Sequence, residues 1–265
     1  MATILSRDGT RIAYEKHGNG PALVIVPGAL CDRACASNPD RIGLLSRDFT
    51  VYTYDRRGKG ESGDTLPYAV EREIEDLWAV IDAAGGSAFV YGHSSGGALA
   101  LQAAGQPGTR IKRLALYEVP YNDDLKAKAA WKEYIAQLAR LLAEGKKGAA
   151  VASFFRLMGT PPDRIAGMRN APFWPAMEAM APTLAYDHTA ILGPENAVPA
   201  DLAVRVTVPT LVMSGDAGLP FMKVTAGTLS RIIPHALLRI LEGQTHEVRQ
   251  EALAPVLLEF FLKQP

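Results

Sequence analysis

A serine flanked by glycines is the residue of this chain best placed to act as a nucleophile. Ser94 is the centre of the segment Gly92-His93-Ser94-Ser95-Gly96, which follows an apolar run at 88–91 and precedes the small residues 97–101. A strand that ends in G-x-S-x-G and continues into a helix forms the sharp turn called a nucleophile elbow. Glycine suits the positions two before and two after the serine, because a side chain there would collide with the turn. We expect the serine hydroxyl to project from the end of a sheet, facing the positive N-terminus of the following helix.

A serine hydroxyl needs a general base, and we predict that His246 supplies it. His246 lies in a polar loop, residues 243–247, between the last apolar strand and a C-terminal helix. That loop follows a strand parallel to the one before Ser94, so both residues belong to the same edge of the sheet. His93 lies inside the elbow and is expected to point away from the nucleophile.

The base in turn needs a carboxylate, and two candidates follow strands at this edge. Asp216 comes after the apolar run 211–214. The order Ser94, Asp216, His246 is the chain order of nucleophile, acid and base expected where a strand ends in a nucleophile elbow. Asp216 is the preferred acid. Glu118, at the end of the strand that follows the nucleophile helix, is the alternative.

Acyl transfer also needs donors for an oxyanion. We predict the backbone N–H of Ser95 as one donor and that of Ala29, in the loop Pro27-Gly28-Ala29-Leu30, as the other.

The elements around these residues alternate between strands and helices. Short β-branched and aromatic runs at 23–26, 50–54, 88–91, 113–117, 210–214 and 236–241 predict buried parallel strands, and residues 11–14 predict an antiparallel edge strand. Helical spacing at Val70, Ile74, Leu77 and Ile81 predicts a crossover helix between two of them. The fold class is therefore α/β, a mostly parallel doubly wound sheet.

The alternation breaks in the middle of the chain, where all predicted elements are helices. We expect a core domain made of residues 1–120 and 199–265, and a helical lid at 121–198. Phe173, Trp174 and Met177 are candidates for a lid face that contacts a substrate. The same side chains could instead pack the interior of the lid.

Composition narrows the possible partners. The chain has 28 basic and 28 acidic residues, which indicates neither nucleic acid nor an anionic membrane as a partner. We expect a small-molecule substrate, no cofactor and no metal; the oligomeric state stays open. No signal peptide and no apolar run of roughly 18 residues is apparent, so a cytoplasmic location is expected. Cys31 and Cys35 are expected to be small buried hydrophobic residues rather than metal ligands or a disulfide.

Together these motifs resemble the α/β-hydrolase superfamily, from about Thr10 to Phe261. The stretch Asp55-Arg56-Arg57-Gly58-Lys59-Gly60-Glu61-Ser62 is similar to a D-x-R-G-x-G-x-S segment that is usually structural in that family. Gly215-Asp216, ahead of Pro220, is similar to the acid loop of esterase-like and cofactor-free haloperoxidase-like members. Pro27-Gly28 departs from the His-Gly that many members carry, but it keeps the glycine and the backbone donor.

The resemblance implies a serine hydrolase that cleaves an ester-like bond of a small to medium, partly apolar substrate. Serine at the elbow disfavours the haloalkane dehalogenases and epoxide hydrolases, which use aspartate. Three alternatives stay open: a ligand-binding or sensor protein with vestigial hydrolysis, a perhydrolase or haloperoxidase, and a carbon–carbon bond hydrolase.

Overall fold

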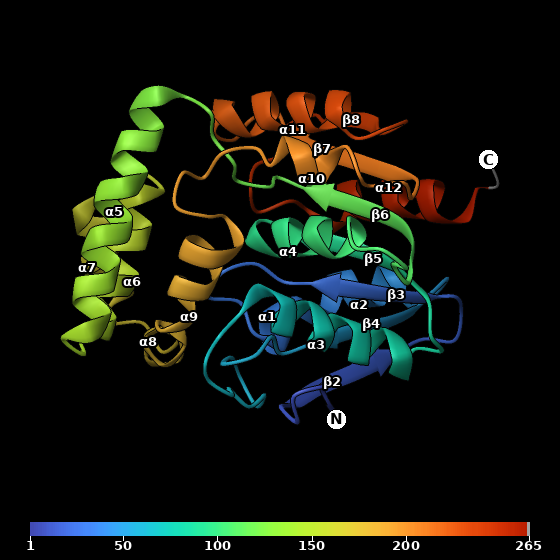
Figure 1. Cartoon of the computed structure of the whole chain (residues 1–265), viewed down its shortest axis with the longest axis horizontal. Coiled ribbons are helices and arrows are strands. Elements are labelled where there is room, and N and C mark those ends of the chain that lie inside the picture. Colours follow the sequence, from blue (N-terminus) through green and yellow to red (C-terminus); the bar gives the residue numbers. More distant parts are fainter. Residues whose placement is uncertain (264–265) are drawn as a thin grey trace.

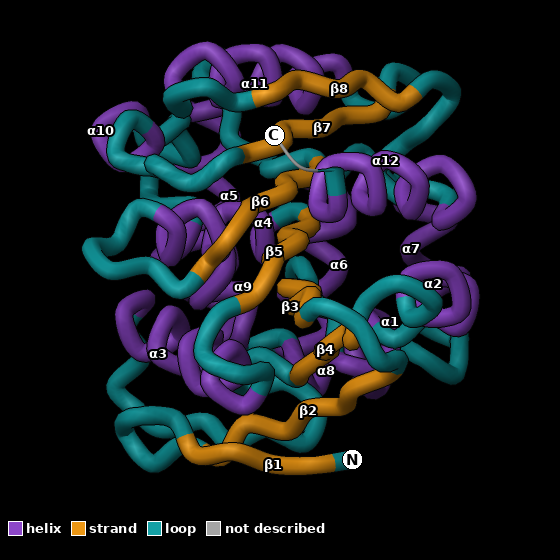
Figure 2. Tube along the Cα trace, turned by 90° about the vertical axis from the view of Figure 1, so that its right-hand side faces the viewer, coloured by secondary structure: helices purple, strands orange, loops and turns teal. Residues whose placement is uncertain are grey.

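The chain forms one eight-stranded, mostly parallel sheet in a computed structural model that describes residues 1–263. Gln264 and Pro265, the end of the expected core domain, lie outside the described residues. The strand order is β1-β2-β4-β3-β5-β6-β7-β8, and Figure 2 shows it from β1 at the bottom to β8 at the top. The strands are β1 Ala2–Leu5, β2 Arg11–His17, β3 Ala22–Val26, β4 Thr50–Tyr54, β5 Ala88–His93, β6 Ile111–Tyr117, β7 Thr210–Gly215 and β8 Leu237–Leu241. The predicted α/β fold class is confirmed.

The two N-terminal strands are antiparallel to their neighbours, and the other pairs are parallel. The prediction that residues 11–14 form the edge strand is wrong in one respect. β2 is antiparallel as expected, but β1 lies outside it and forms the edge. β1 has only four residues, and none of them is buried, so it carries little apolar signal.

Helices cover both faces of the sheet, which explains the continuous apolar runs in the central strands. In β3, Val24 and Val26 pack with α3 and α4, whereas Leu23 and Ile25 pack on the opposite face with α2 and α12. Figure 2 shows α3 on one side of the strands and α2 and α12 on the other. The core helices are α1 Arg33–Ala36, α2 Pro39–Leu45, α3 Val70–Ala83, α4 Ser95–Ala104, α10 Ala200–Ala203, α11 Pro220–Ile232 and α12 Gln250–Leu262.

A helical segment separates β6 from β7. It contains α5 Leu125–Ala143, α6 Lys147–Leu157, α7 Pro162–Met168, α8 Trp174–Met180, α9 Thr183–Ala185 and the π-helix η1 Tyr186–Ile191. Figure 1 shows α5–α8 beyond one end of the sheet, the end toward which the arrowheads of β3 and β6 point. In the part of the chain that the structure describes, no helix combines the length and the apolar character needed to cross a bilayer.

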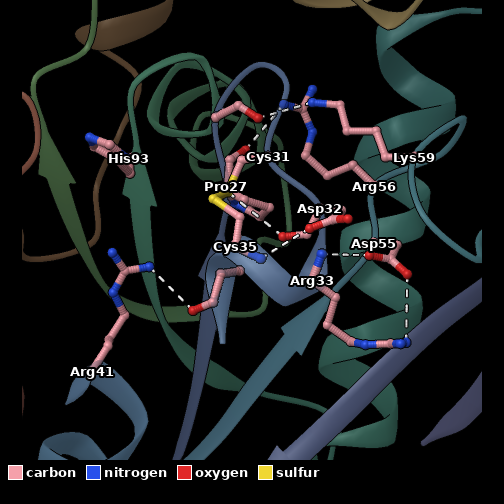
Figure 3. The surroundings of a disulfide bond; sticks show 12 residues. Pro27, Cys31, Asp32, Arg33, Cys35, Arg41, Asp55, Arg56, Lys59 and His93 are labelled. Atoms are coloured by element: carbon pink, nitrogen blue, oxygen red, sulfur yellow. Dashed lines mark hydrogen bonds and ion pairs between the residues drawn. A yellow bond between two sulfur atoms is a disulfide. The ribbon is translucent and has the colours of Figure 1, made fainter. Parts of the chain in front are cut away.

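The expectation of two free, buried cysteines is wrong. Cys31 and Cys35 form a disulfide, with their Cα atoms 5.4 Å apart, and Cys35 is exposed. Cys31 lies in the loop before α1, outside the helix, so the two residues do not share a helix face. Asp32 caps α1 by accepting from the Cys35 N–H at 3.0 Å, and this turn brings the two sulfur atoms together (Figure 3).

Candidate active site

Ser94 occupies the strained turn between β5 and α4. Its φ of 57° and ψ of −131° lie in a region that residues other than glycine rarely adopt, and its N–H donates to Tyr117 O at 3.0 Å. A Cβ on Gly92 would lie 2.6 Å from Gly97 Cα, and one on Gly96 would collide with the Val26 carbonyl oxygen. The structure thus has the elbow geometry that the sequence predicts, and it requires glycine at both flanking positions.

His246 and Glu118 form the only pair among the predicted acid and base candidates that touch within residues 1–263. His246 Nδ1 lies 2.8 Å from Glu118 Oε2. The Glu118 side chain is completely buried, and its Oε1 accepts from the Gly215 N–H at 3.0 Å and from the Ser214 hydroxyl at 3.2 Å. Because a carboxylate only accepts, Nδ1 of His246 donates this hydrogen bond, and in a neutral imidazole the lone pair then lies on Nε2.

The expected contact between Asp216 and His246 is not formed, which corrects the predicted pairing. Asp216 is exposed, and its Oδ1 accepts from the Gly243 N–H at 2.7 Å, so this carboxylate caps the turn that begins the His246 loop. Glu118 occupies the place beside the imidazole because its positive φ of 48° turns the chain at the end of β6. Asp216 and Glu118 were both candidates because each is a carboxylate that directly follows an apolar strand.

The side chains of His93, next to Ser94, and Tyr117, next to Glu118, hold the His246 loop. His93 Nε2 lies 3.0 Å from the His246 carbonyl oxygen, and the Tyr117 hydroxyl donates to Thr245 O at 2.6 Å. Burial and then the neighbouring His246 lower the pKa of His93 well below its usual value, so this ring is neutral near pH 7. His93 faces His246, with ring centroids 4.6 Å apart, as a support of the loop.

The Ser94 hydroxyl forms no hydrogen bond with His246 within the described chain. Ser94 and His246 are nevertheless connected through neighbours, since His93 precedes the serine and contacts the His246 backbone. Catalytic hydrogen bonds are often long in ligand-free proteins and shorten when substrate binds.

The loop after β3 lies against the serine. A Cβ on Gly28 would be 3.0 Å from Ser94 Cβ and 3.5 Å from Ser94 Oγ. The N–H groups of Ala29 and Ser95, the two predicted oxyanion donors, have no hydrogen-bond acceptor among residues 1–263.

A buried cluster of charges, which sequence reasoning missed, lies behind this loop. Asp187 of η1 accepts from Arg56 at 2.6 Å, Lys59 at 3.0 Å and the Ser95 hydroxyl at 2.8 Å, and Glu73 accepts from Arg56 Nε at 2.6 Å. Each of the four charged side chains is at most 1% exposed. We call Arg56, Lys59, Glu73 and Asp187 the buried charge cluster.

The pKa values of this cluster follow from burial and pairing. Burial raises the pKa of Asp187, but the charges of Arg56 and Lys59 outweigh burial, and its pKa is lowered overall. Burial and the nearby Arg56 lower the pKa of Lys59, while Asp187 opposes them. The two cations and two carboxylates balance in charge, which is what allows such groups to be buried.

The three predicted substrate-contacting residues fall at the start of α8. Phe173 is 46% exposed, and Met177 is half-buried against the main core. Trp174 is buried; its indole N–H donates to Glu178 at 2.7 Å and its ring stacks on Phe155. Trp174 thus packs the interior of the helical segment, which was the alternative to a substrate-facing position.

Comparison with known proteins agrees with this fold. The sequence profile of the Alpha/beta hydrolase family matches residues 23–256, and the chain belongs to this family. An alpha/beta hydrolase of Sphaerobacter thermophilus is similar over 98% of this chain and 100% of its own, with 49% identity and a TM-score of 0.88.

More distant relatives carry more specific names. A thermophilic esterase from Thermogutta terrifontis has a TM-score of 0.71 at 23% identity, over 97% of this chain and 96% of its own. A zearalenone hydrolase of Cladophialophora bantiana is 30% identical over 125 residues, which are 45% of this chain. The matched stretch spans about half of that relative, 47% of its length. The esterase supports the fold alone.

Proposed function

We propose that this hydrolase cleaves a carboxylic ester or lactone of a small molecule through an acyl-enzyme formed on Ser94. His246 Nε2 takes the proton of the Ser94 hydroxyl as Oγ attacks the carbonyl carbon. Glu118 holds the Nδ1–H and stabilises the imidazolium that forms. The Ala29 and Ser95 N–H groups bind the oxyanion. The leaving alcohol takes the proton from His246, and water then attacks the acyl-enzyme with His246 again acting as base.

The observation that carries this proposal is the contact between His246 Nδ1 and the buried carboxylate of Glu118 at the sheet edge where Ser94 occupies the elbow. A buried acid, a histidine and a serine in a strained turn are the parts that nucleophilic acyl transfer requires. The name of the zearalenone hydrolase relative agrees with hydrolysis of a small molecule. The helical segment 121–198, which lies beyond the carboxyl ends of the strands, is proposed as the lid over the substrate.

The test is turnover of a series of p-nitrophenyl esters with increasing acyl length, measured for the wild type and for Ser94→Ala. The matched control is Ser230→Ala on α11, whose hydroxyl donates to Gly227 O of its own helix. We expect Ser94→Ala to abolish turnover while the far-ultraviolet circular dichroism stays unchanged, and Ser230→Ala to keep full activity. A fluorophosphonate, which forms an Oγ–P bond and expels fluoride, should label Ser94 alone. Turnover that survives in Ser94→Ala would refute the proposal.

A further inference from the structure

Two carbonyl groups of the loop after β3 are held by cations of the buried charge cluster. Arg56 Nη1 donates to Pro27 O at 3.2 Å, and Lys59 Nζ donates to Gly28 O at 3.0 Å. Figure 3 shows Arg56 and Lys59 reaching the stretch of chain that begins at Pro27. The carbonyl side of this loop therefore faces the cations.

The carbonyl held by Lys59 belongs to the same peptide group as the Ala29 N–H. This peptide is trans, since the only cis bond within residues 1–263 is Leu66–Pro67. In a planar trans peptide the C=O and N–H bonds point in opposite directions. The contact with Lys59 consequently turns the Ala29 N–H away from the cluster. Gly28, on the same peptide, lies against Ser94.

Asp187 keeps the Lys59 ammonium group in this place. Its Oδ2 accepts from Lys59, and its Oδ1 accepts from the hydroxyl of Ser95, whose own N–H is the second predicted donor. One carboxylate of the helical segment is thus connected to both peptides that would bind an oxyanion.

We propose that Lys59, held by Asp187, is a positioning residue for the oxyanion hole. It fixes the direction of the Ala29 N–H and, by hydrogen bonding to the carbonyl of the same peptide, polarises that N–H as a donor. The inference rests on the proposed function and adds a residue that never touches the substrate.

The central test is Lys59→Met, which keeps most of the side-chain volume and removes the ammonium group. Loss of a whole oxyanion donor lowers kcat by about 100- to 1,000-fold, so misdirection of one donor should lower kcat by roughly 10- to 100-fold. KM for the p-nitrophenyl ester should change by less than about threefold, because the contact matters mainly in the transition state. The rate of fluorophosphonate labelling at Ser94 should fall with kcat.

Because Lys59→Met leaves the cluster with one excess negative charge, it can fail to fold. The double variant Lys59→Met/Glu73→Gln restores the charge balance, since Glu73 contacts Arg56 and Tyr68 but not the loop after β3. We expect the double variant to recover the melting temperature but not kcat.

Arg57→Met is the matched control for loss of a buried cation. Arg57 lies in the same segment and is fully buried, but it pairs with Asp76 and Asp8 and not with the loop after β3. Its variant should lower the melting temperature and leave kcat of the folded protein unchanged.

Recovery of kcat in the double variant to within about threefold of the wild type would show that Lys59 acts only through stability, and would overturn the proposal. An unchanged labelling rate in folded Lys59→Met would overturn it as well. Failure of the proposed function looks different, because the wild type itself would then show neither turnover nor labelling at Ser94.

Discussion

Replacement of Glu118 by glutamine tests which carboxylate serves His246. Glu118 accepts three hydrogen bonds, from His246 Nδ1, the Gly215 N–H and the Ser214 hydroxyl. In Glu118→Gln the amide oxygen can keep the last two bonds, which places the amide NH2 against the imidazole. An NH2 group donates, so His246 must accept at Nδ1 and carry its proton on Nε2. That tautomer cannot take a proton from Ser94.

We expect kcat to fall by about 1,000- to 10,000-fold, which corresponds to about 4 to 5.5 kcal/mol of transition-state stabilisation. The fold should persist, because glutamine has nearly the same size and keeps two of the three bonds. Asp216→Asn is the matched control: its amide oxygen still accepts from the Gly243 N–H, so kcat should stay within about threefold.

The assay is hydrolysis of the preferred p-nitrophenyl ester, with circular dichroism to show that each variant is folded. A large loss in Asp216→Asn, together with more than about a tenth of wild-type kcat in Glu118→Gln, would refute the acid role of Glu118. The catalytic acid would then be the exposed carboxylate, and the His246 loop would have to move before catalysis.

Three further predictions concern folding and stability. Gly96→Ala should prevent the native fold, measured as loss of soluble protein or of the thermal transition, because its Cβ would collide with the Val26 carbonyl oxygen. Burial lowers the pKa of His188 to about 4. The unfolded chain then binds a proton that the folded chain does not, so the free energy of unfolding should decrease by about 3 kcal/mol as pH falls from 6.5 to 4. In urea titrations the decrease should be smaller in His188→Phe than in the wild type by about this amount, because His93, whose pKa is also lowered, keeps its own contribution. A thiol assay on denatured protein should find no free thiol before reduction and the thiols of Cys31 and Cys35 after it, and reduction should lower stability by about 2 kcal/mol or less.

The parts of the fold that the sequence predicts well are those with local signals. The central strands are buried on both faces, so each is a continuous apolar run, and the elbow glycines are required by a turn only a few residues long. β1 was not predicted because no residue in it is buried, so it has no apolar pattern that would indicate a strand. Ser94 and His246 could be proposed because Ser94 directly follows β5 and His246 lies in the loop between β8 and α12.

The choice between acids depends on non-local geometry. Asp216 and Glu118 both follow parallel strands, and only the docking of the His246 loop decides which one contacts the imidazole. The loop is fixed by Tyr117 and His93, more than a hundred residues earlier in the chain. The disulfide depends likewise on the turn made by Asp32, which a spacing of four residues does not reveal.

The buried charge cluster is the part of the molecule for which stability alone offers the weakest explanation. Desolvation of four charges opposes folding, and well-packed apolar side chains in the same places are often equally stable or more so. Apolar side chains, however, cannot hold a carbonyl in one direction. Arg56 and Lys59 do this for Pro27 and Gly28, and Asp187 connects them to Ser95. The cluster is therefore better explained by the direction it gives to two backbone N–H groups than by the free energy it adds to the fold.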